Sequence, residues 1–230
     1  LPKIKKRFVL VTGDSDLSVP KEALSKEETY TLLKSAFLIK WFAQNTRIQE
    51  NDKLVQMPIG IDYHTLYYRV KLLPSIQESR ITELMKNVRP FYERNTTGIH
   101  VCFAKCNDRF GQRKECLEKI PNELLDCHFT YVPRDRLWEM MTKCAFVVSP
   151  FGVGMDCHRT WEALCLGCIP IVCAPHFKKL FEDLPVLVVN DWSEITKDLL
   201  VQTIEEFKTR TFNLDKLTMK YWVSRIKNGE

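Results

Sequence analysis

The 230-residue sequence has no apolar run long enough to cross a lipid bilayer, and no signal-peptide pattern opens it. These two absences argue against an integral membrane protein, so we expect no membrane span and a cytoplasmic location rather than the Golgi lumen. The first residue is Leu1 rather than Met. We therefore expect the chain to be part of a larger multidomain polypeptide.

A large excess of charge of one sign is also missing. Lys and Arg number 34 against 29 Asp and Glu, which gives a formal net charge of +5. This excess is too small and too dispersed to indicate a nucleic-acid partner. It is compatible with a small ligand that carries phosphate.

Paired cysteine motifs at zinc-finger spacing are absent as well. The chain has nine cysteines, and Cys165 and Cys168 form a CxxC motif, but no second pair follows at the required distance. Several cysteines lie in apolar segments such as "HVCFAKC" and "TKCAFVV". We interpret them as buried free thiols of a protein from a reducing compartment, and we expect no bound metal.

What the sequence does contain is a regular alternation of short apolar segments and amphipathic segments, from about residue 96 onward. This alternation predicts a parallel sheet with helices on both faces, which is an α/β fold. The segment before it predicts a smaller α/β unit of two strands and two helices, the helices spanning about 21–43 and 74–88. We therefore predict two domains, residues 1–95 and residues 96–230.

In an open parallel sheet, ligands bind beyond the carboxyl ends of the strands. One such place is the loop "SPFGVG", between a strand that ends at Val148 and a helix predicted to begin near Asp156. Gly152 and Gly154 allow the backbone to approach a ligand closely, and a helix N-terminus offers unpaired N–H groups. This combination favours an anion such as phosphate. It is neither a Walker loop nor a complete nicotinamide fingerprint.

The helix after this loop carries charged residues at a spacing of three. Asp156, Arg159 and Glu162 are predicted to share one side of it. Glu162 would then lie roughly 9 Å from the helix start, a depth at which its carboxylate could accept hydrogen bonds from a ribose. Arg159 and His158 would face the phosphates. Equally, Asp156 could cap the helix while Arg159 and Glu162 form a solvated pair, and both interpretations stay open.

The segment "SPFGVGMDCHRTWEALCLGCIPIV", residues 149–172, resembles the donor-binding segment of exostosin-like glycosyltransferases, including related enzymes of large algal viruses. It contains the more general GT-B pattern as "EAL" followed by Gly167, Pro170 and Val172. The stretches "FVLVTGDSDLSVP" and "MPIGID" resemble the same group. The resemblance implies a GT-B-like fold, with a Rossmann-type domain for the sugar nucleotide and a small N-terminal unit for a glycan acceptor. It implies transfer of a sugar from a nucleotide-diphosphate donor, expected to be UDP-linked, to a glycan hydroxyl.

The resemblance also assigns roles to residues. The expected donor-binding residues are Arg109, Arg113, Ser149, Gly152, Val153, Gly154, Met155, Asp156, His158, Arg159 and Glu162. Arg113, at the start of a predicted helix, is the first choice for the diphosphate and Arg109 the reserve; both could instead be solvated loop residues. Retaining GT-B enzymes usually carry an acid eight residues before the ribose-binding one, where this chain has Gly154. We therefore expect an inverting, metal-independent mechanism with no cofactor beyond the sugar nucleotide.

Inverting transfer needs a general base to take the proton of the acceptor hydroxyl. Asp14 and Asp16, in "TGDSD" after the first strand, are the primary candidates, and His64 with Asp62 is the second choice. A turn-forming role for the acids of this segment is an equally good explanation.

Two other functions remain open. Asp14-Ser15-Asp16 is a DxD motif, by which enzymes of the GT-A class bind a divalent metal ion that bridges a diphosphate. The chain would then be a GT-A-like, metal-dependent transferase. Alternatively, because the N-terminal half is small for an acceptor domain, the chain could be a non-catalytic module that binds nucleotide sugar or glycan for a neighbouring domain.

Overall fold

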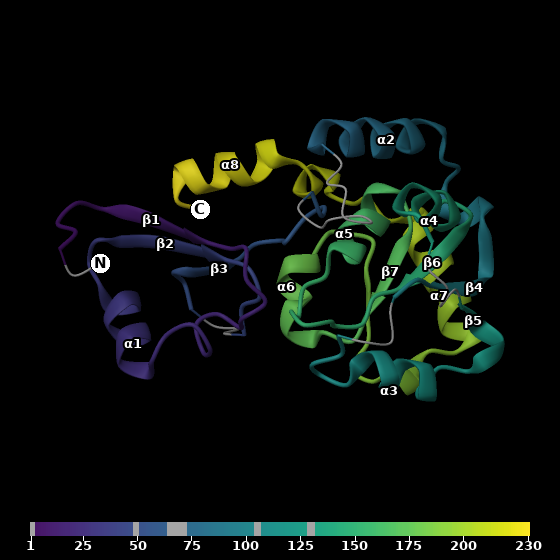
Figure 1. Ribbon diagram of the computed structural model, residues 1–230, viewed down its shortest axis with the longest axis horizontal. Coiled ribbons are helices and arrows are strands. Elements are labelled where there is room, and N and C mark those ends of the chain that lie inside the picture. The colour runs from purple at the N-terminus through teal and green to yellow at the C-terminus, as the bar shows by residue number, and fades with distance from the viewer. Residues whose placement is uncertain (1–2, 48–50, 64–72, 104–106, 128–131) are drawn as a thin grey trace.

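The computed structural model describes residues 3–47, 51–63, 73–103, 107–127 and 132–230. The protein is an α/β protein in which two parallel sheets are accompanied by helices. The smaller sheet with its helix and the larger sheet with its helices lie side by side as two units, as Figure 1 shows.

The smaller sheet consists of β1 (Phe8–Thr12), β2 (Leu38–Ala43) and β3 (Leu54–Gln56), parallel and in that order. Helix α1 (Lys26–Lys34) connects β1 to β2. It starts at a capping box: Ser25 Oγ accepts from the backbone N–H of Glu28 at 3.1 Å, and the Glu28 carboxylate accepts from the N–H of Ser25 at 2.9 Å. The start of this helix is therefore fixed by local sequence.

The long helix predicted over about 21–43 is wrong, because its second half is strand β2. Helix α1 ends at Lys34, and four of the six residues of β2 are buried, since this strand lies between β1 and β3. A strand that is buried on both faces is apolar without alternation. Over such a short stretch, the spacing of apolar residues in a buried strand cannot be distinguished from their spacing in a buried helix.

The larger sheet contains five parallel strands in the order β5-β4-β6-β7-β8. Their bounds are Asn95–Val101 for β4, Leu125–Cys127 for β5, Cys144–Val148 for β6, Ile169–Val172 for β7 and Leu187–Val188 for β8. The parallel sheet predicted for the second part of the chain is confirmed, and its topology is compatible with a Rossmann-like fold.

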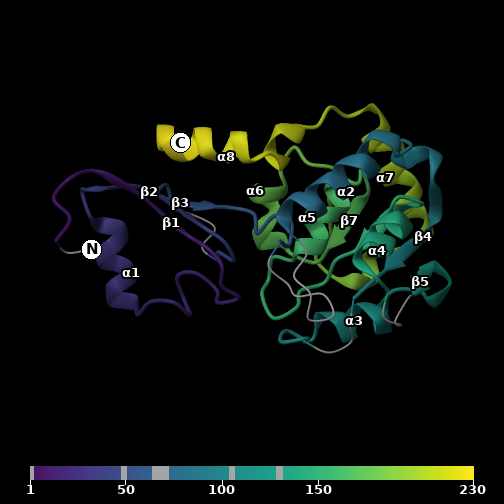
Figure 2. The same ribbon diagram turned by 45° about the horizontal axis from the view of Figure 1, so that its top comes forward.

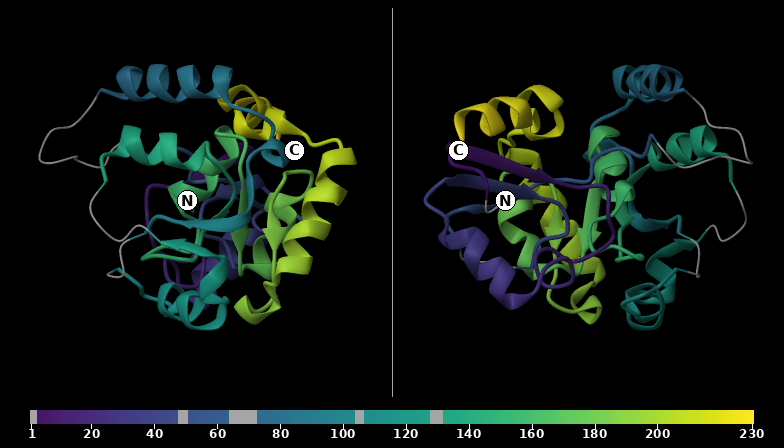
Figure 3. Two further views of the ribbon diagram at one scale, coloured as in Figure 1. Left: turned by 90° about the vertical axis from the view of Figure 1, so that its right-hand side faces the viewer. Right: turned by 60° about the vertical axis from the view of Figure 1, so that its left-hand side comes forward.

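Helices cover both faces of this sheet, as predicted (Figure 3). They are α2 (Pro74–Asn87), α3 (Gln112–Lys119), α4 (Arg134–Met141), α5 (His158–Cys165), α6 (Lys178–Phe181) and α7 (Lys197–Thr209). On one face, Ile99 and Phe146 of the sheet pack with Cys116 of α3 and Ile204 of α7. On the other face, Val147 packs with residues of α4 and α5.

The helix predicted over about 74–88 forms as α2, but it packs against α4 rather than against the first sheet. Its buried residue Ile81 belongs to the same hydrophobic cluster as Trp138 and Met141 of α4. A predicted domain boundary near residue 95 therefore separates two helices that contact each other.

The last helix, α8 (Met219–Asn228), returns from the larger unit to the smaller one (Figures 1 and 2). Trp222 packs with Trp161 and Phe181 of the larger unit. At the other end, a Cβ placed on Gly229 would lie 2.8 Å from the Ile39 side chain of β2. Helix α8 thus contacts both units.

Within the described ranges, none of the helices combines the length and the hydrophobicity that crossing a bilayer requires. All eight described cysteines are free thiols. Cys168 is buried and Cys165 packs beside it in the cluster of Trp138 and Met141, as expected for thiols of the core.

Candidate functional site

The order of strands in the larger sheet identifies where a ligand would be expected. After β4 the chain adds β5 on one side of it, and then returns to add β6 on the other side. The reversal opens a crevice beyond the carboxyl ends of β4 and β6, which is the usual binding place in open α/β sheets. The glycine-containing loop 149–157 follows β6 directly, so the predicted loop lies at this crevice.

Two arginines predicted to bind the donor lie on one aromatic ring at the crevice. The guanidinium carbons of Arg159 and Arg113 are 5.2 and 5.7 Å from the ring centre of Phe103, just after β4. Arg159 also donates hydrogen bonds of 3.3 Å to Ser149 Oγ and to the Pro150 carbonyl. In the described part of the chain, no carboxylate forms an ion pair with Arg159. Arg159 therefore brings to the crevice a positive charge that no described carboxylate neutralises.

The absence of a side chain at Gly152 leaves room for the guanidinium of Arg113. A Cβ at this position would lie 2.5 Å from Nη2 of Arg113, whose Nε donates to the Phe151 carbonyl at 3.2 Å. The N–H of Gly152 donates to the Gly154 carbonyl at 3.0 Å. Gly154 in turn faces the smaller unit, since a Cβ there would lie 2.8 Å from Asp16 Oδ1. The loop is therefore packed between Arg113 and the smaller unit.

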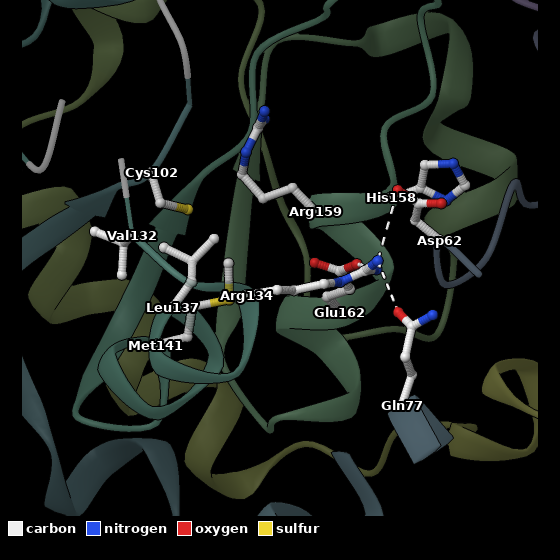
Figure 4. A pocket seen from close by; sticks show the side chains of 10 residues that line it. All are labelled: Asp62, Gln77, Cys102, Val132, Arg134, Leu137, Met141, His158, Arg159 and Glu162. Atoms are coloured by element: carbon white, nitrogen blue, oxygen red, sulfur yellow. Dashed lines mark hydrogen bonds and ion pairs between the residues drawn. The ribbon is translucent and has the colours of Figure 1, made fainter. Parts of the chain in front are cut away.

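A cavity of about 240 Å³ lies beside this loop (Figure 4). Its lining residues are Asp62, Gln77, Cys102, Val132, Arg134, Leu137, Met141, His158, Arg159 and Glu162. One wall is mainly apolar, and burial raises the pKa of the Cys102 thiol in it to about 12, so this thiol is neutral. The opposite wall carries the charged and polar groups.

Arg134 is the centre of the polar wall, and the sequence analysis missed it. Its guanidinium donates to Gln77 Oε1 at 3.0 Å, forms an ion pair with Glu162, and lies 3.6 Å from Asp62 Oδ2. It also stacks over Trp138, with 5.0 Å from its central carbon to the ring centre. A signal existed, because Arg134 begins the helix after β5 just as Arg113 lies at the start of the helix after β4.

Glu162, the predicted ribose ligand, lines the cavity, but its carboxylate is engaged by Arg134. Helix α5 begins at His158, two residues later than predicted, with Cys157 in the N-cap position and no side-chain cap. Glu162 therefore lies about 6 Å rather than 9 Å along the helix from its start. The alternative of a solvated Arg159–Glu162 pair is wrong, since Glu162 is buried and pairs with Arg134.

Asp156 does not share a helix side with Arg159 and Glu162, and it is not the N-cap, so both interpretations of it are wrong. It precedes α5 and is buried, and its carboxylate accepts from the Ile59 N–H and from Trp161 Nε1, both at 2.8 Å. Burial raises the pKa of this carboxyl to about 7, although the two hydrogen bonds oppose the rise. Asp156 thus connects the loop after β3 to the larger unit.

Three other predicted donor ligands do not line the cavity. Met155 is buried, and its Sδ lies 3.1 Å from Nε of Arg47 in the smaller unit. Arg109 forms an ion pair of 2.5 Å with Glu22, and Val153 is exposed on the loop. These residues are near the glycine loop in sequence, but none of them lines the cavity.

The remaining two predicted ligands lie close to it. His158 lines the cavity, with its Nδ1 2.8 Å from the Gly60 carbonyl, and Ser149 is buried at the end of β6 with its Oγ 2.8 Å from Thr160 Oγ1. Because Ser149 also accepts from Arg159, it holds that guanidinium at the mouth of the crevice.

The candidate bases lie in different places, and only some of those described line the cavity. Asp14 has a left-handed backbone, φ 58°, and its N–H donates to Gln44 Oε1 at 2.9 Å, in keeping with a turn-forming role. Of the candidate acids that the structure describes, Asp62 lines the cavity, while Asp14 and Asp16 do not. His64 lies outside the described residues. Among those that are described, no third ligand-type side chain joins Asp14 and Asp16 closely enough to hold a metal ion.

A scan against protein-family models finds no match, and a search of the curated proteins finds no significantly similar sequence.

Proposed function

We propose that the chain is a glycosyltransferase of GT-B-like architecture, which binds a UDP-type sugar nucleotide at the crevice beyond β4 and β6. The observation that carries the proposal is the pair of arginines on Phe103, with Arg159 lacking a described carboxylate partner beside the uncapped start of α5. A cation without a described carboxylate partner, beside a helix N-terminus that no side chain caps, favours a phosphate group.

The cavity supports a place for the rest of the nucleotide. It adjoins Arg159 and ends at Glu162, so a diphosphate at the arginines would direct its ribose toward that carboxylate. Its volume of about 240 Å³ is below the roughly 300–1,000 Å³ usual for sites of small ligands. Binding of a whole sugar nucleotide therefore requires Arg134 to move from between Glu162, Asp62 and Gln77, or the two units to separate slightly.

For the transfer step we propose inversion, in which Asp62 accepts the proton of the acceptor hydroxyl. Asp62 follows β3 of the smaller unit and reaches the cavity, so it lies where an acceptor held by that unit would meet the donor. The arginines would stabilise the leaving diphosphate.

Titration calorimetry with UDP tests the site. Arg159→Ala and Glu162→Gln should each weaken binding about 10- to 100-fold, because a hydrogen bond to a charged group contributes about 1.5–3 kcal/mol. Arg136→Ala is the matched control, since Arg136 lies exposed on α4 with its guanidinium on Glu139. Unchanged affinity in both site variants would refute the proposed site.

A non-catalytic module for nucleotide sugar is the second candidate, favoured by the position of Asp14 and Asp16 away from the cavity. Hydrolysis of a UDP-sugar by the isolated chain, or transfer to a simple acceptor, would exclude this module. Binding without either reaction would support it.

A further inference from the structure

Three side chains of metal-ligating type meet on adjacent strands of the larger sheet, apart from the cavity. They are His100 of β4, Asp126 of β5 and Cys144 of β6. His100 and Asp126 are register partners in the parallel pair of β4 and β5, so their side chains leave the same face of the sheet. The third strand, β6, lies on the other side of β4.

The ligand atoms of the three side chains all lie within 4.8 Å of one another. Ligands of a tetrahedral zinc ion lie roughly 3.4–3.6 Å apart, given bond lengths of about 2.0–2.3 Å. Rotations of the three side chains would have to close this difference for them to bind one ion.

Two of the three side chains are buried and the third is exposed to solvent. His100 and Cys144 are 1% and 5% exposed, whereas Asp126 is exposed. Within the described residues, Sγ of Cys144 makes no hydrogen bond. The neighbouring Arg94 donates to the Cys144 carbonyl and to Sγ of Cys168. An ion could thus enter from the side of Asp126 and meet the thiol inside.

The donor set determines which ion fits. One nitrogen, one sulfur and one carboxylate oxygen suit a borderline-soft transition metal, whereas Mg²⁺ and Ca²⁺ prefer oxygen ligands alone. Three protein ligands leave a fourth tetrahedral position for water, which the exposed side at Asp126 can supply.

We propose that His100, Asp126 and Cys144 form a site for Zn²⁺ that ties β5, β4 and β6 together. Binding releases the thiol proton of Cys144 to solvent, and the thiolate, the imidazole and the carboxylate become ligands. None of the three residues lines the cavity of the proposed sugar-nucleotide site, so the metal site is independent of that function.

The test is a titration of the metal-free full chain with Co²⁺, a spectroscopic substitute for Zn²⁺. We expect one equivalent to produce a thiolate-to-cobalt charge-transfer band and the visible bands of a tetrahedral ion, both removed by added Zn²⁺. Cys144→Ser should abolish the charge-transfer band. Asp126→Asn, at an exposed position, should keep the band and weaken binding by more than the roughly 10- to 100-fold that loss of an outer-sphere partner causes.

Cys127→Ser is the matched control, because Cys127 belongs to the same strand as Asp126 but leaves the opposite face, and its variant should keep the band. The proposal is overturned if the unaltered chain shows no charge-transfer band. It is also overturned if Cys127→Ser removes the band, or if Asp126→Asn binds Co²⁺ as tightly as the unaltered chain. The last outcome can be read even if Cys144→Ser does not fold.

Discussion

The role of Asp156 is determined by its neighbours in space rather than by its neighbours in the sequence. It stands between a glycine loop and a helix, where an acid commonly caps the helix or contacts a ligand. In the folded chain, its carboxylate is instead buried against the Ile59 N–H and the Trp161 indole. Ile59 is 97 residues away in the sequence, so no local pattern could have indicated this contact.

The raised pKa of Asp156 predicts a specific pH dependence of stability. The folded state holds the Asp156 proton up to about pH 7, whereas the unfolded chain releases it near the ordinary value of 3.8. This group's contribution is therefore complete below about pH 4 and is lost as the pH rises to about 7. The loss amounts to up to about 4 kcal/mol for a shift of about three pKa units.

Asp156→Asn, which cannot ionise, should remove this part of the pH dependence. Urea unfolding measures the free energy of unfolding at pH 5 and at pH 7.5. Its decrease between the two pH values should be smaller for the variant than for the unaltered chain. Asp135→Asn, in the exposed first turn of α4, should leave the dependence unchanged. If the Asp156 variant kept the full dependence, the carboxyl would be ionised in the folded protein throughout this range.

At the scale of single elements, local signals determine where helices begin. Thr196 caps α7, its Oγ1 accepting from the Leu199 N–H at 3.1 Å, and the helix then buries Leu200, Ile204 and Phe207 against the larger sheet. The apolar face alone provides most of the stability of such a helix, and the cap adds to it at one end.

Thr196→Ala should lower the free energy of unfolding by about 1 kcal/mol, the usual effect of losing a threonine cap. Urea denaturation of the variant measures it. Thr209→Ala, at the other end of α7, removes a hydroxyl that donates to the Glu206 carbonyl of its own helix, and it should change stability by less than about 0.5 kcal/mol. Equal effects of the two substitutions would show that capping does not limit the stability of α7.

At the scale of the whole molecule, Asn45 joins the two units. Its Oδ1 accepts from the N–H groups of Met155 and Asp156 at 3.1 and 2.8 Å, and its Nδ2 donates to the Ser15 carbonyl. The backbone of Asn45 is left-handed, φ 52°, so glycine can replace it without strain.

Asn45→Gly should release the amides of Met155 and Asp156. We expect their hydrogen exchange to quicken about five- to tenfold, since each loses a hydrogen bond of about 1 kcal/mol. Asn107→Gly is the control, because Asn107 is also left-handed, φ 61°, but is exposed. Unchanged exchange at both amides would mean that α8 and Asp156 hold the units together without Asn45.

Much of the candidate site could be predicted from the sequence of the loop after β6 and the helix that follows it. Gly152, Ser149, Arg159 and Glu162 lie at the crevice because a loop at the carboxyl end of a parallel strand must open onto that edge of the sheet. The position of Arg134 at the start of α4 could be expected in the same way, but its contacts and those of Gln77 could not. Arg134 reaches Glu162 from α4, and Gln77 of α2 accepts from Arg134, so their role depends on how separate helices pack.

The sequence by itself determined the parallel α/β character of the second part of the chain, since alternating periodicities and capping residues act over a few neighbours. It also determined the position of the glycine loop. Only the tertiary structure decided that 38–43 is a strand, that Asp156 is buried between units, and that Arg134 engages Glu162. These outcomes depend on burial and on ion pairs between segments far apart in the chain, and those exist only once the segments have packed.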